Sequence, residues 1–167
     1  GDIASNILYG NPDGSEAEMT EAATIAQATE FIEQKKKKYK STISQGGSNV
    51  SGGQKQRLSI ARAIAKHPDI YIFDDSFSAL DYKTDATLRA KLKEKTSEST
   101  VMIVAQRIST ILHADQIIVL DDGQIVGKGT HKELLKNCEA YYQIASSQLS
   151  EKELEEDLKE VESYAKR

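Results

Sequence analysis

The sequence has few of the features that mark secreted, membrane-spanning or nucleic-acid-binding proteins. Its single cysteine, Cys138, cannot close an internal disulfide, which fits a reducing, cytosolic setting. No apolar run approaches the roughly 20 residues of a membrane span, and the N-terminus shows no signal-peptide pattern. The net charge of −4 over 167 residues is slight, with both signs mixed. The length indicates one domain or part of one, and the charge gives no support for a nucleic-acid partner.

One basic run, the four lysines at 35–38, stands apart from this mixed charge pattern. It could be a nucleic-acid patch, or it could be the solvated end of a helix, where cations complement the helix dipole. The run follows an expected helix in an acidic chain, so we favour the second interpretation.

Periodicity, capping boxes and turn signals predict an alternation of helices and strands. Ser15 with Glu18, and Thr130 with Glu133, have the spacing of capping boxes. Helices are expected over 15–36, 55–66 and 83–95, and strands over 70–74, 100–105, 116–120 and 124–126. This alternation indicates an α/β layer fold.

The most informative loop comprises Ser51, Gly52, Gly53 and Gln54, directly before an expected helix. Two glycines allow the backbone to approach a ligand closely, and a helix start presents free N–H groups and the positive end of the dipole. Such a loop is suited to binding a phosphate group.

The second informative segment is the apolar run 70–73, which ends in Asp74 and Asp75. It predicts a buried strand that delivers carboxylates to its C-terminal tip, where α/β proteins hold ligands. Carboxylate oxygens are also the ligands that Mg²⁺ prefers. The loop and the strand together indicate nucleotide chemistry.

Four motifs in order resemble those of ATP-binding-cassette (ABC) ATPases. Residues 50–54 resemble the signature loop, and residues 70–74 resemble the Walker B strand. The D-loop is matched by Ser78, Ala79, Leu80 and Asp81. Residues 104–107 stand where the family carries its switch-histidine loop, and the likeness extends over residues 1–148.

The resemblance implies a P-loop NTPase-type ABC ATPase domain of the α/β class that is truncated. The sequence has no Gly-x-x-x-x-Gly-Lys-Ser/Thr loop, which is Walker A in this family. In the family, Walker A and the glutamine loop precede a segment that residues 1–11 resemble. We therefore expect the C-terminal part of a nucleotide-binding domain, which alone binds ATP poorly, hydrolyses none and has an open sheet position that lowers its solubility.

The expected division is a partial ABC ATPase domain at 1–148 and a charged helical tail at 149–167. Within the domain, 1–68 would be the mainly helical signature subdomain and 69–148 the α/β core. The tail carries a narrow apolar stripe at Leu154, Leu158, Val161 and Ala165. It could dock on a partner or remain a solvated helix.

By resemblance, two such domains pair head to tail around two ATP molecules. Ser51, Gly52, Gly53 and Gln54 would then contact the γ-phosphate of the ATP that the partner holds. Asp74 would hold Mg²⁺ through water, and the D-loop, with Asp81, would lie at the domain interface. The cofactors implied are ATP and Mg²⁺.

Two catalytic positions depart from the family pattern. Asp75 stands where the family has glutamate, so its carboxylate sits about 1.5 Å further back. Gln106 replaces the histidine, and glutamine cannot titrate or carry a positive charge. Gln45 also replaces a glutamate that is usual in exporters. We interpret this chain's own ATP site as degenerate, able to bind ATP but slow to hydrolyse it.

The leading interpretation is the ATPase component of an ABC exporter, paired with a second and different nucleotide-binding domain. A transmembrane domain fused upstream would place it at the cytoplasmic face of a bacterial membrane. The alternatives are a homodimeric exporter with an active Asp75 and a soluble ABC-type ATPase of DNA repair. The transported substrate cannot be inferred from these residues. His67, His113 and His131 match no catalytic position and are expected at the surface.

Overall fold

The computed structural model describes the backbone of residues 1–164 and the side chains of residues 1–158. The chain forms two compact units, Gly1–Val104 and a second that begins at Ala105, and each is described by itself. The expected division at residue 68 differs from this boundary and remains a proposal.

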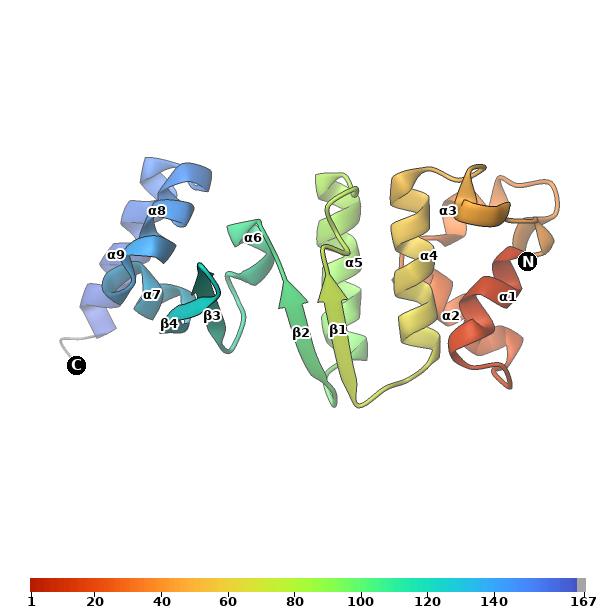
Figure 1. The fold of residues 1–167 in the computed structure, drawn as a ribbon, viewed down its shortest axis with the longest axis horizontal. Helices are drawn as coiled ribbons and strands as arrows, with labels where there is room; N and C mark the ends of the chain where they lie inside the picture. Colours follow the sequence, from red (N-terminus) through yellow and green to blue (C-terminus); the bar gives the residue numbers. More distant parts are fainter. Residues whose placement is uncertain (165–167) are drawn as a thin grey trace. The chain divides into compact units, whose positions relative to one another are not determined.

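The first unit is built from short helices followed by a longer helix and a β-α-β segment (Figure 1). Its helices are α1 (Ile3–Ile7), η1 (Leu8–Gly10), α2 (Glu16–Ile25), α3 (Thr29–Glu33), η2 (Lys38–Lys40), η3 (Gln45–Gly47), α4 (Gly52–Ala65) and α5 (Tyr82–Lys95). Its strands are β1 (Ile70–Asp74) and β2 (Thr100–Val104).

The helix expected over 15–36 is wrong as a single element. Its start is confirmed, because Ser15 caps α2 in a reciprocal capping box with Glu18. The helix then breaks at Gln27, whose φ of 56° lies in the left-handed region. The break frees the main-chain carbonyl of Gln27, which accepts a 2.8 Å hydrogen bond from Arg57 of α4. The turn also lets α3 bury Phe31 in the core.

The basic run follows the end of α3, as expected for a solvated helix end. Lys38 forms an ion pair with Glu33 at the end of that helix. The hydrogen bond from Lys38 to Glu33 raises the pKa of the lysine. The charge of this lysine is thus partly compensated by a neighbouring carboxylate.

Strands β1 and β2 form a two-stranded parallel sheet in which Asp74 lies opposite Val104. One face contributes Tyr71 and Phe73 to the core of the unit, where α5 places Leu88 and Leu92. The other face is apolar and open to solvent. Its exposed side chains are Ile70 (58% exposed), Ile72 (68%), Met102 (57%) and Val104 (59%). Apolar side chains exposed together in this way are typical of a surface that contacts another protein segment.

The second unit combines a β-hairpin with helices (Figure 1). Its elements are α6 (Ile108–Ile111), β3 (Ile117–Asp121), β4 (Gln124–Gly129), α7 (His131–Asn137), α8 (Glu139–Gln148) and α9 (Glu151–Tyr164). The predicted hairpin is confirmed, since β3 and β4 pair antiparallel around Asp122 and Gly123. Both turn residues have positive φ, 45° and 74°, as a tight two-residue hairpin requires.

Helix α9 corresponds to the charged tail. Leu154 is only 8% exposed and Leu158 is partly buried, and both join the core of the second unit. The first part of the apolar stripe therefore packs within its own unit. The side chains of Val161 and Ala165 lie outside the described residues.

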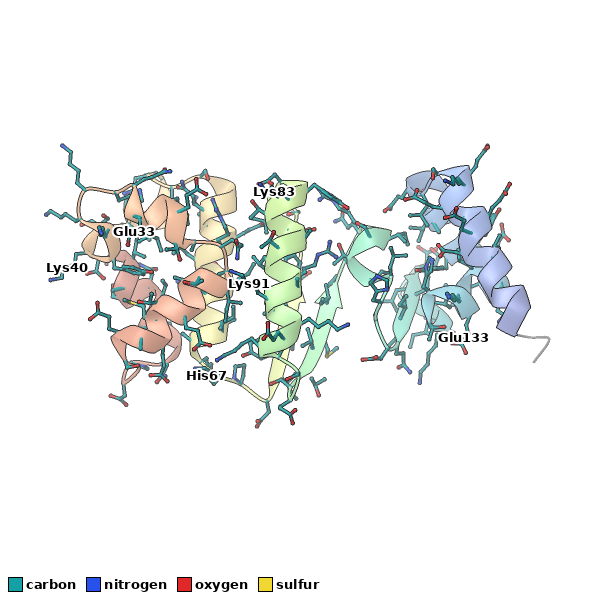
Figure 2. The ribbon with its side chains drawn as sticks, turned by 180° about the vertical axis from the view of Figure 1, so that it is seen from behind. Glu33, Lys40, His67, Lys83, Lys91 and Glu133 are labelled. Carbon is teal, nitrogen blue, oxygen red and sulfur yellow. The ribbon has the colours of Figure 1, made fainter. Side chains whose placement is uncertain are left out.

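The expectation that His131 is a surface residue is wrong. Its side chain is 4% exposed, and its ring contacts Tyr141 of α8 edge-on. Nδ1 lies 2.7 Å from the Tyr141 hydroxyl, and Nε2 lies 3.1 Å from Oδ2 of Asp157 on α9. Burial, with a smaller contribution from Asp157, raises the pKa of Tyr141 to about 12. In contrast, His67 after α4 (Figure 2) and His113 are exposed, as predicted.

Replacing His131 by phenylalanine is expected to loosen the attachment of α9. The variant removes the hydrogen bonds to Tyr141 and Asp157 and leaves the buried Tyr141 hydroxyl without its partner, which destabilises by about 1–3 kcal/mol. Chemical denaturation of the protein that contains this unit measures the effect. His113→Phe is the matched control at an exposed site, and equal stability of the two variants would contradict the assignment.

No helix among residues 1–164 is both long enough and apolar enough to span a bilayer.

Candidate functional site

The signature-like residues 51–54 form the N-terminal end of α4, which is closed by a capping box. Ser51 is the N-cap, and its hydroxyl accepts a 3.2 Å hydrogen bond from the amide of Gln54. In return, Oε1 of Gln54 accepts from the amide of Ser51 at 3.1 Å. The amides of Gly52 and Gly53 lie at the first helical positions, where an α-helix provides no internal acceptor. The predicted helix start, with two amides that lack internal acceptors, is therefore present, and phosphate binding there stays a prediction.

The glycines of this loop also lie against the segment 78–81. A Cβ atom added to Gly53 would come 2.8 Å from the main-chain oxygen of Ala79, so no side chain fits there without moving the backbone. A Cβ atom on Gly52 would make only an ordinary contact, 3.8 Å from the Ala79 side chain. The two glycines thus have different requirements: Gly53 is needed for packing, and Gly52 has room.

Asp74 and Asp75 stand at the C-terminal end of β1, as predicted. Both side chains are exposed. Asp75 has a φ of 47°, in the left-handed region that aspartate adopts more readily than most residues other than glycine. The hydroxyl of Ser78 lies 3.1 Å from Oδ2 of Asp75 and 3.2 Å from its main-chain oxygen, so it can donate to either.

The rest of the D-loop-like segment has two structural roles. Leu80 is buried in the core. Asp81 is the N-cap of α5 and accepts hydrogen bonds from the Thr84 hydroxyl at 2.6 Å and the Thr84 amide at 3.0 Å. These hydrogen bonds, with the hydroxyl contributing most, lower the pKa of Asp81. The carboxylate therefore stays ionised into acidic solution while it caps the helix.

Gln106 belongs to the second unit and its side chain is exposed. Its main chain is held by Gln148 at the end of α8. Nε2 of Gln148 donates to the Gln106 carbonyl at 2.8 Å, and its Oε1 accepts from the amide of Ile108 at 2.9 Å. The sequence reasoning missed Gln148, because its partners lie 40 residues or more away along the chain.

The structure brings together those predicted site residues that belong to the first unit. The signature-like loop, Asp75 and the segment 78–81 belong to one unit and are joined by direct contacts. Gln106 lies in the separately described second unit. No group of three or more potential metal-ligating side chains forms within the described part of the chain. Asp74 still fits Mg²⁺, which is commonly bound by one or two carboxylates and several waters.

The comparisons with known proteins agree with this geometry. The family model described as ABC transporter matches residues 4–78, which contain the signature-like loop and both aspartates. An ABC transporter ATP-binding protein of Mycobacterium tuberculosis, itself uncharacterized, is 48% identical over 151 residues, which are 89% of this chain. The chain is part of an ABC transporter ATP-binding domain.

Two further proteins that this ABC domain resembles are named as a flippase and as an exporter. The ATP-dependent lipid A-core flippase of Photobacterium profundum is 43% identical over 85% of the chain and is itself covered to 24%. The solved structure of a bacterial Atm1-family ABC exporter with ATP bound is 35% identical, with a TM-score of 0.85. That likeness covers 90% of this chain and 26% of the exporter. This ABC domain spans about a quarter of the length of its curated relatives.

Proposed function

We propose that this chain is the ATP-binding and ATP-hydrolysing component of an ABC exporter. The observation that carries the proposal is the capped start of α4, where Gly52 and Gly53 present free amides beside the segment 78–81. The fold agrees with an exporter that was solved with ATP bound. The relative named as a flippase and the solved exporter favour a transporter over a soluble ATPase of DNA repair.

The cofactors that fit are ATP and Mg²⁺. The amides at the start of α4, with Ser51 and Gln54, would bind the γ-phosphate of the ATP held by the partner domain. The exposed carboxylate of Asp74 would hold Mg²⁺ through water. The metal would supply charge neutralisation for the phosphate oxygens.

We also propose that the chain's own ATP site is degenerate. Asp75 is one methylene shorter than glutamate, and a shift of about 1 Å in a catalytic group can cost about a hundredfold in rate. Gln106 can donate and accept hydrogen bonds but cannot carry a charge. The signature loop is intact and would serve the partner's ATP, so the competent site of the pair would be the one that this chain completes.

The proposed exporter requires three components besides this chain. One is a second, different nucleotide-binding domain, and another is a transmembrane domain in the same protein, at the cytoplasmic face of a bacterial membrane. The third is the remainder of the ABC domain, with its Walker A loop, which would cover the apolar face of β1 and β2. The transporter that contains this chain is called the parent transporter below.

A homodimeric exporter is the second candidate. The hydrogen bond from Ser78 orders the Asp75 carboxylate, as a working catalytic base would require. ATP hydrolysis by the parent transporter, purified alone and then with its candidate partner, decides between the two. We expect turnover only with the partner, and little change when Asp75 is replaced by glutamate. Brisk turnover by the parent transporter alone would support the homodimer and contradict the degenerate site.

A further inference from the structure

One side chain joins the helix that carries the signature loop to the segment that carries Asp75. Gln56 lies one turn inside α4, and its amide spans the gap to the residues after β1. Nε2 of Gln56 donates to the main-chain oxygen of Asp75 at 3.0 Å and to the hydroxyl of Ser78 at 3.0 Å. Oε1 of Gln56 accepts from the amide of Ala79 at 2.9 Å.

The orientation of this amide is determined by its surroundings. The Ala79 amide can only donate, and the Asp75 carbonyl can only accept, so turning the Gln56 side-chain amide over would set donor against donor and acceptor against acceptor. The three groups that Gln56 contacts, the Asp75 carbonyl, the Ser78 hydroxyl and the Ala79 amide, are therefore each matched in polarity. The Ser78 hydroxyl accepts from Gln56 and keeps its own hydrogen for Asp75.

The same segment is held from a second side. The main-chain oxygen of Ala79 lies so close to Gly53 that a Cβ atom there would stand 2.8 Å away. Gln56 and Gly53 are both on α4 and both contact Ala79. Movement of the Asp75–Ala79 segment without α4 would break the hydrogen bonds, and movement toward α4 is blocked at Gly53.

We propose that Gln56 is a positioning residue that fixes the position of the signature loop relative to the Asp75–Ala79 segment. The inference rests on the proposed function, in which the first serves the partner's ATP and the second serves this chain's own. Nucleotide binding at the chain's own site would then shift the signature loop that completes the other site. Gln56 itself touches neither nucleotide.

The test uses the parent transporter with its partner and compares Gln56→Leu with Gln34→Leu. The control makes the same change at an exposed position at the end of α3. Hydrogen exchange measured without nucleotide reports directly on the hydrogen bonds between Gln56 and the Asp75–Ala79 segment. In Gln56→Leu we expect the peptide containing Ala79 to exchange about tenfold faster, because its amide has lost its acceptor. Gln56→Glu keeps an acceptor for that amide and should lie between wild type and Gln56→Leu.

The catalytic arm measures ATP turnover of the same complexes. Gln56→Leu should lower kcat about tenfold and leave the KM for ATP within about twofold, since the loss is one of positioning. Gln34→Leu is expected to leave both kcat and KM unchanged, so a lower kcat in Gln56→Leu alone reports on the loss of this positioning.

Each outcome has a definite meaning. Faster exchange at Ala79 together with a lower kcat supports the inference. Unchanged exchange, or faster exchange with unchanged kcat, overturns it. Absence of turnover in the wild-type complex refutes the proposed function and the effect of Gln56 on catalysis. The hydrogen-exchange measurement still decides whether Gln56 holds the Asp75–Ala79 segment.

Discussion

Replacing Gly52 by aspartate is expected to lower ATP turnover of the parent transporter with its partner by about a hundredfold or more. The carboxylate would place a negative charge at the helix start that binds the γ-phosphate, and loss of one such preorganised contact costs about 10²–10³ in kcat. Gly52 is suited to this experiment because a Cβ atom there makes only a 3.8 Å contact. Gly53 is unsuitable, since any side chain would displace Ala79.

Two comparisons make this result specific to the signature loop. Ser59→Asp adds the same charge at an exposed position further along α4 and should leave turnover unchanged. Asp75→Asn removes the candidate base of the chain's own site. It should change turnover by no more than about twofold, because that site contributes little to the total turnover. If Asp75→Asn abolished turnover as Gly52→Asp does, the chain's own site would be a competent one.

Restoring the two departures from the family pattern is expected to produce a gain of activity. In a complex whose partner carries an inactivated catalytic carboxylate, only this chain's own site can hydrolyse ATP. Asp75→Glu combined with Gln106→His should then raise turnover about a hundredfold, the rate that a displacement of about 1 Å in a catalytic group can cost. Steady-state ATP hydrolysis measures the gain.

The single replacements serve as controls for this gain. Each is expected to raise turnover less than the pair, because residues of one site act together. The positive φ of Asp75 makes thermal unfolding a necessary parallel measurement, since glutamate adopts this conformation less readily than aspartate. A stable double variant without increased turnover would show that neither departure limits the site.

Local sequence patterns predicted those parts of the structure that neighbouring residues determine. The strands at 70–74 and 100–104 follow from short apolar runs rich in β-formers, and the helix starts at Ser15 and Thr130 follow from capping boxes. The helix start after Ser51 was predicted from its two glycines, but α4 begins at Gly52 and not at the expected Lys55, because Ser51 and Gln54 complete each other's hydrogen bonds within one turn.

Features that involve residues far apart in the sequence were not predicted. The break at Gln27 is accompanied by a hydrogen bond from Arg57, which is 30 residues away, and no glycine or proline signals it. The burial of His131 depends on Asp157 of α9, 26 residues away. Gln56 reads as one more polar position on an amphipathic helix, and only the fold brings its amide to Asp75 and Ala79. Hydrogen bonds between residues so far apart in the sequence leave no pattern in the sequence around either residue.

The central claim is that the two ATP sites of the pair are unequal, and vanadate trapping of a photoreactive ATP analogue tests it most directly. Hydrolysis followed by trapping labels the chain whose Walker motifs hold the nucleotide. The parent transporter and its partner differ as chains and can be separated after crosslinking. The account predicts that the label is found on the partner. Label found mainly on the chain that carries Asp75 and Gln106 would contradict it.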